Sequence, residues 1–113
     1  MPSTLAPHIR TVKIAQVATP AAIDELIADP GDGYQIVVLG ISLSLHLAGS
    51  FQFLDSAASP VALTGDITLA TNGVYTAGFT GMPLFRCTAS EPLRFVSTTG
   101  AANGFVTYTI DAA

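Results

Sequence analysis

Short runs in which apolar and polar residues alternate cover most of this chain. The longest run, residues 34–47, places five aliphatic side chains on one face: Val37, Leu39, Ile41, Leu43 and Leu45. Alternation with a period of two is typical of a strand that buries one face. Ala48-Gly49 turns the chain into a second run, with Phe51, Phe53 and Asp55 on one face and Ser50, Gln52 and Leu54 on the other. The two runs therefore predict a hairpin of antiparallel strands.

Further alternating runs predict strands along the rest of the chain. They cover residues 11–18, 61–70, 93–97 and 104–110, and the glycine at position 65 permits a bend within one of them. Residues 74–81 contain two glycines, so we expect an irregular crossing segment there. The Asp-Pro-Gly-Asp-Gly sequence at 29–33 predicts a turn before the longest strand.

Residues 20–28 fit two different structures. Thr19 could cap a helix with Pro20 at its first position, and the residues that follow favour a helix. That helix would have fewer than three turns and would end at Pro30, so in isolation it would be marginal. The alternative is a short strand over Glu25–Ala28.

The predicted architecture is an all-β, antiparallel β-sandwich of jelly-roll type with about eight strands. Turn signals separate strands at intervals of roughly 8–12 residues, which is the spacing of such folds. Residues 11–113 are expected to form this single domain. Residues 1–10 carry two prolines and no periodicity, so we expect a flexible N-terminal arm.

Charge is scarce, and this narrows the possible partners. Only 11% of the residues are charged while 50% are hydrophobic, and the net charge is −4. A typical soluble domain is about 25% charged. A surface of Ser, Thr and small residues suits a protein that packs against copies of itself or a larger particle. Four dispersed cations disfavour nucleic acid. The longest apolar stretch is too short and too interrupted to cross a membrane.

Few side chains suggest chemistry. Cys87 is the only cysteine, which excludes an intrachain disulfide and leaves it as a small buried hydrophobe. His8 and His46 lack the spacing of a metal site. Asp24 and Glu25 would point apart on a strand, which argues against paired acid–base catalysis. We therefore expect no enzyme, no catalytic residue, no metal and no cofactor.

Arg86, Glu91 and Arg94 stand out in an otherwise apolar part of the chain. Glu91 could form an ion pair with one of the arginines within the chain, which would contribute little stability. The alternative is an ion pair between subunits that sets the register of an oligomer. We take these three residues as the candidate oligomer interface.

From Tyr34 onwards, over about three-quarters of its length, the chain resembles small β-rich virion proteins of tailed bacteriophages, of the capsid-decoration or head-fibre type. The resemblance is carried by six segments: QIVVLGISLS (35–44), SFQFL (50–54), ALTG (62–65), LATNG (69–73), PLFRCTASEPL (83–93) and GFVTY (104–108). In that family a strand ending in an Ile/Val-Ala pair precedes the first segment. Leu26-Ile27-Ala28 is similar to it, and this favours the strand over the helix.

The resemblance implies a jelly-roll sandwich, a homotrimer and a capsid-decoration (cement) function without an active site. The partners would be other copies of the chain and the major capsid protein. The protein would be made in the bacterial cytoplasm and reside on the outer capsid surface of the virion. The arm could then reach the shell, and its candidate contacts are Leu5, His8 and Arg10.

One alternative function remains open. A fibre or spike domain that binds a host receptor or glycan would need exposed aromatic side chains. Tyr34, Tyr75 and Phe79 lie near predicted loops and are the candidates.

Overall fold

A computed structural model describes residues 9–16, 23–56, 61–80, 82–99 and 102–113. These residues form ten strands and no helix. The strands are β1 (Arg10–Gln16), β2 (Asp24–Ile27), β3 (Tyr34–Leu45), β4 (Gly49–Asp55), β5 (Val61–Ala62), β6 (Ile67–Leu69), β7 (Gly73–Gly78), β8 (Phe85–Arg86), β9 (Leu93–Ser97) and β10 (Ala102–Ala112).

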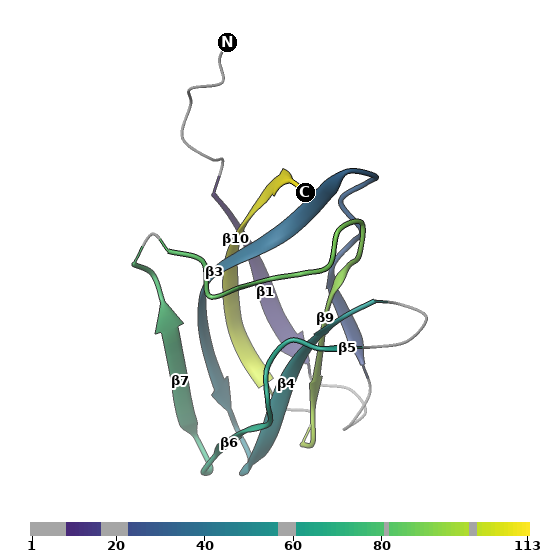
Figure 1. The fold of residues 1–113 in the computed structure, drawn as a ribbon. Coiled ribbons are helices and arrows are strands. Elements are labelled where there is room, and N and C mark those ends of the chain that lie inside the picture. Colours follow the sequence, from purple (N-terminus) through teal and green to yellow (C-terminus); the bar gives the residue numbers. More distant parts are fainter. Residues whose placement is uncertain (1–8, 17–22, 57–60, 81, 100–101) are drawn as a thin grey trace.

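The strands form two antiparallel sheets packed face to face (Figure 1). Sheet A has the order β1-β10-β3-β7, with β8 also paired to β3. Sheet B has the order β2-β9-β4-β5, with β6 also paired to β4. β3 and β4 follow each other in sequence but belong to opposite sheets, so the predicted hairpin between them is wrong. β9 and β10 are divided between the sheets in the same way, whereas β4 and β5 share sheet B. This is the jelly-roll order, so the predicted antiparallel β-sandwich is confirmed.

The number of strands differs from the prediction for a simple reason. β5 and β6 both pair with β4, and β7 and β8 both pair with β3. Ten segments therefore occupy eight strand positions. The predicted strand over 61–70 is two short strands, separated where Gly65 is exposed.

The core lies between the sheets and is built on three phenylalanine rings. Phe51 and Phe53 of β4 and Phe95 of β9 are fully buried. The Phe53 and Phe95 ring centroids are 5.2 Å apart, and the Phe51 and Phe53 rings meet edge to face at 6.0 Å. Burying side chains of this size stabilises the fold by about 1.5–3 kcal/mol each.

A β-bulge in β3 changes which residues face the core. Thr107 of β10 is opposite Gly40, whereas Tyr108 is opposite Val38, so Leu39 is an extra residue on β3. A bulge of one residue reverses the faces on its two sides.

The prediction of a single apolar face along β3 is therefore wrong for its first half. Ile36 and Val38 face the core before the bulge, and Ile41, Leu43 and Leu45 face it afterwards. Val37 and Leu39, which were expected on that inner face, do not belong to the core cluster. Val37 is nevertheless buried, and Leu39 lines an open pocket.

Two other predictions concern short segments. The glycine-containing segment after Asn72 is not irregular, because β7 pairs with β3 over six residues from Gly73 to Gly78. Residues 24–27 form β2, so the strand was the correct alternative there. The predicted arm lies largely outside the described residues, and β1 begins at Arg10.

Candidate functional site

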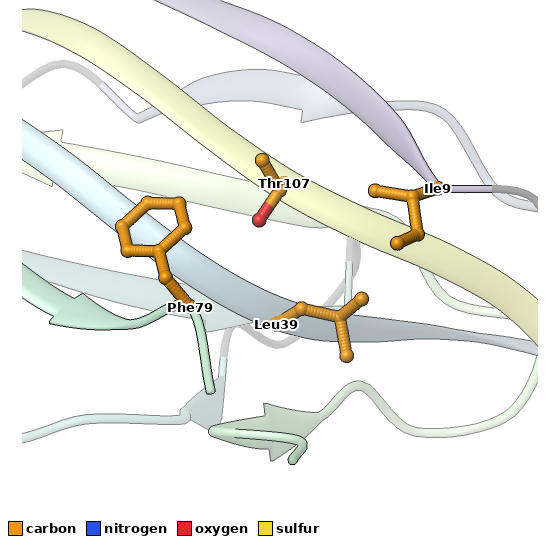
Figure 2. A pocket seen from close by; sticks show the side chains of 4 residues that line it. All are labelled: Ile9, Leu39, Phe79 and Thr107. Atoms are coloured by element: carbon orange, nitrogen blue, oxygen red, sulfur yellow. The ribbon is translucent and has the colours of Figure 1, made fainter. Parts of the chain in front are cut away.

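The outer face of sheet A carries exposed apolar side chains from several strands. Ile9 is 63% exposed, Phe79 47% and Phe105 38%. An open apolar pocket of about 220 Å³ is lined by Ile9, Leu39, Phe79 and Thr107. Figure 2 shows Ile9 and Phe79 on opposite sides of this pocket, with Leu39 and Thr107 between them.

Backbone features of β3 and β7 place the pocket residues. The bulge turns Leu39 outwards. Gly78 has φ +85, and the N–H of Phe79 donates a hydrogen bond of 3.1 Å to the carbonyl oxygen of Leu39. Gly40 has no side chain, and a Cβ there would lie 2.5 Å from the Phe79 ring. The ring therefore lies directly on the backbone of β3.

Phe79 itself has a strained backbone. Its φ is +62, a conformation that aromatic residues rarely adopt. Such strain costs on the order of 1–3 kcal/mol and is found at functional positions. The fold thus holds a large apolar ring on the surface at an energetic cost.

The apolar surface extends beyond the pocket. The Phe79 and Phe105 rings lie 6.0 Å apart between centroids, at 59°. Val74 of β7 is also exposed on this side, because its neighbour Tyr75 packs inwards. We call Ile9, Leu39, Val74, Phe79 and Phe105 the apolar face. All five side chains are uncharged, so this surface is suited to contact with another uncharged surface.

The two arginines of the predicted interface lie in different sheets. Arg86 is exposed on β8 in sheet A, and Arg94 is half-buried on β9 in sheet B. Because Phe85 and Phe95 point into the core, the two arginines leave the sandwich from opposite outer faces. Glu91 is half-buried in the loop before β9. The structure therefore does not bring Arg86 and Arg94 together.

The predicted contacts of the arm fall only partly within the described residues. Arg10 is exposed at the start of β1. Leu5 and His8 lie outside the described residues.

The aromatic candidates for a glycan site also separate. Tyr34 is 50% exposed at the start of β3, and Phe79 belongs to the apolar face. Tyr75 packs against Phe51, with ring centroids 5.6 Å apart, and is part of the core. The three residues therefore do not form a common aromatic platform.

One buried carboxylate lies beside the lone cysteine. Asp55 is fully buried, and its Oδ2 accepts a hydrogen bond of 2.6 Å from the N–H of Thr88. Burial, and secondarily the negative charge of Asp55, raises the pKa of Cys87 from 9.0 to about 12. Cys87 is thus a buried, protonated thiol, and the prediction of a small buried hydrophobe is confirmed.

Within the described ranges, no three His, Cys, Asp or Glu side chains are grouped so that they could hold a metal ion. His46 is exposed at the end of β3. No membrane-spanning helix is found in the described part of the chain either.

Sequence reasoning singled out Phe79 but missed the other members of the apolar face. Ile9, Leu39 and Phe105 come from three distant segments, and Leu39 is turned outwards by a bulge that has no clear sequence signal. The one available signal was the scarcity of charge: between Gly33 and Arg86 the only charged residues are Asp55 and Asp66. Comparison with protein-family models, with curated proteins and with solved structures finds no match to this chain.

Proposed function

We propose that the protein is a structural virion protein, a capsid-decoration (cement) protein that binds the outer surface of a phage head as a homotrimer and stabilises it. The observation that carries this proposal is the apolar face. A patch of exposed, uncharged side chains over a regular sheet is typical of protein–protein contact surfaces.

The distribution of charge supports the same function. Residues 34–85 contain only two charged side chains, and one of them, Asp55, is buried. A free monomer gains solubility from surface charge, whereas a protein packed against neighbours does not need it. The jelly-roll sandwich also agrees with the resemblance to small phage virion proteins.

A cement protein can bind a particle through individually weak contacts, because each oligomer makes several of them at once. Three apolar faces in one trimer engage a particle together, so the second and third contacts form at a high effective concentration. A closed ring of subunits also leaves no open end for further growth.

The first test measures binding to purified heads that lack the protein. We expect a trimer by light scattering, binding to expanded heads, and heads that resist heat or low salt better when occupied. F79S should reduce the number of bound copies strongly, because it removes the ring that lies on Gly40. A wild-type protein that is monomeric and does not bind heads would refute the proposal.

Y34S is the matched control, because Tyr34 is as exposed as Phe79 but lies outside the apolar face. It should bind heads as the wild type does. Equal losses for F79S and Y34S would show that the apolar face has no special role.

Deletion of residues 1–8 tests the arm separately: we expect an intact fold and weaker binding to heads. Binding of a glycan by Tyr34 and Phe79, with no affinity for heads, would favour the fibre alternative.

A further inference from the structure

The open edge of sheet A at β7 has no feature that protects it. β7 pairs with β3 on one side, and in Figure 1 no described strand lies beyond it on the other. Its six residues, GVYTAG, include no charge and no proline, and its register with β3 is regular. An edge strand presents unpaired N–H and C=O groups to any strand that approaches it.

The other sheet edges in the described part of the chain are protected. β1 carries Arg10 and Lys13, and β2 carries Asp24 and Glu25 as well as a bulge. β5, β6 and β8 have only two, three and two residues, and β8 carries Arg86. Charges, bulges and short length are the usual ways in which proteins block pairing at an edge. β7 is the exception.

We infer that β7 pairs antiparallel with β7 of a second copy of this chain, across a twofold axis perpendicular to the sheet. A twofold contact places each residue near its own copy, so any charge on β7 would face a like charge. β7 has none. The protected edges of a neighbouring copy are poorer partners, because they carry charges or are too short.

The geometry restricts the possible registers. A twofold axis perpendicular to the sheet keeps the outer face outermost in both copies. Residues opposite each other must then share a face, so Thr76 can be opposite Thr76 or opposite Val74, but not opposite Tyr75, which faces the core. Pairing in this way would join sheet A of one copy to sheet A of the other, so that the two form one continuous sheet.

This inference does not rest on the proposed function, because it uses only the sheet edge. A trimer held by another surface would persist without the β7 contact, and the β7 contact would persist in a protein that never meets a capsid. In light scattering the β7 contact would add a twofold step to the trimer. A wild type that stops at the trimer therefore overturns this inference alone, and one that stops at the dimer overturns the trimer alone.

The test compares T76K with T11K by light scattering over a wide concentration range. Thr76 and Thr11 are both exposed on edge strands of sheet A, at β7 and β1 respectively. T76K should weaken the β7-dependent association step at least about fivefold, because like charges would be opposed. T11K should leave it unchanged. Association by T76K equal to that of the wild type would overturn the inference, as would a wild type without any twofold step.

Charge swapping and cross-linking test the symmetry itself. T76K and T76E should each associate weakly, and an equimolar mixture of the two should regain association. In the register that places Thr76 opposite Thr76, mild oxidation should join two copies of T76C by a disulfide but not two copies of T11C. The native Cys87 is buried and should not compete. Failure of the mixture to recover, together with equal cross-linking of both cysteine variants, would exclude the β7 pair.

Discussion

The two lateral margins of the sandwich differ sharply in charge. On one margin β1 of sheet A lies against β2 of sheet B, and on the other β7 lies against β6. The β1/β2 margin carries four charged residues in eleven, whereas β6 and β7 carry none in nine. Both margins are edges of the same two sheets, so the difference lies in the side chains that the sequence places there.

The two margins therefore differ in how readily another chain can pair with them. The charged side chains at the β1/β2 margin remain hydrated, and they oppose the pairing of another strand with this sheet edge. The uncharged margin shares Val74 with the apolar face, and Phe79 directly follows β7. In the proposed assembly, the charged margin stays in solvent and the uncharged margin contacts other proteins.

The largest expected effect on stability comes from adding a Cβ at Gly78, where β7 closely approaches β3. Gly78 has φ +85, and a Cβ there would lie 2.2 Å from the carbonyl oxygen of Leu39. G78A should therefore lower the free energy of unfolding by about 3 kcal/mol, from backbone strain and from the clash. Urea denaturation measures this loss, which should be accompanied by loss of association through the uncharged margin.

G31A is the control for strain without a clash. Gly31 has φ +103 in the turn before β3, and a Cβ at this position would meet no atom within 4 Å. We expect a loss of about 1 kcal/mol and normal association. Equal losses for G31A and G78A would mean that the close approach of β7 to β3 contributes nothing.

A smaller effect on stability depends on pH and arises from Cys87, which lies in the core. The pKa of Cys87 is raised from 9.0 to about 12 in the folded protein, so the folded state holds this proton more tightly than the unfolded state. Its contribution to stability is complete below pH 9 and is lost as the pH rises towards 12. The wild type should therefore lose more stability than C87A over this range in denaturant titrations.

D55N refines this test. Removing the negative charge should lower the pKa of Cys87 only in part, because burial is the larger cause of the shift. The rate of thiol alkylation as a function of pH reports this change. A Cys87 that reacts in the native protein at about pH 8 as fast as a free thiol would contradict the burial of this side chain.

The smallest effect on folding is expected at the cation bordering the uncharged margin. Arg86 is exposed on β8, at the same edge of sheet A as β7. R86E should change the free energy of unfolding by less than about 0.5 kcal/mol and yet disturb assembly. R94E makes the same reversal on the opposite face of the sandwich. If both variants melt at the wild-type temperature and still assemble, these arginines do not set the register of an oligomer.

Much of the fold could be predicted because strand periodicity is local. The alternation in residues 93–97 separates the buried side chains Leu93, Phe95 and Ser97 from the half-buried Arg94 and Val96. The turn at 29–33 contains a hydrogen bond of 2.7 Å from the Gly31 N–H to Asp29 Oδ1. The β7 strand was missed because its glycines disfavour a strand locally. In the fold, Gly78 permits a close approach to β3, because a Cβ there would lie 2.2 Å from the carbonyl oxygen of Leu39.

The apolar face could not be predicted in the same way. Its residues are brought together by pairing of β1 with β10 and of β10 with β3, contacts between segments that are far apart in the chain. The bulge at Leu39 depends on the register between two long strands, and neither strand signals it alone.

The sequence by itself determined the fold class, the scarcity of charge and its near absence between residues 33 and 86, because these follow from local pattern and composition. Only the tertiary structure decided which uncharged residues reach the surface together and which sheet edge stays open. Burial and edge position depend on long-range strand pairing, and the same alternating run can face inwards or outwards after a shift of one residue.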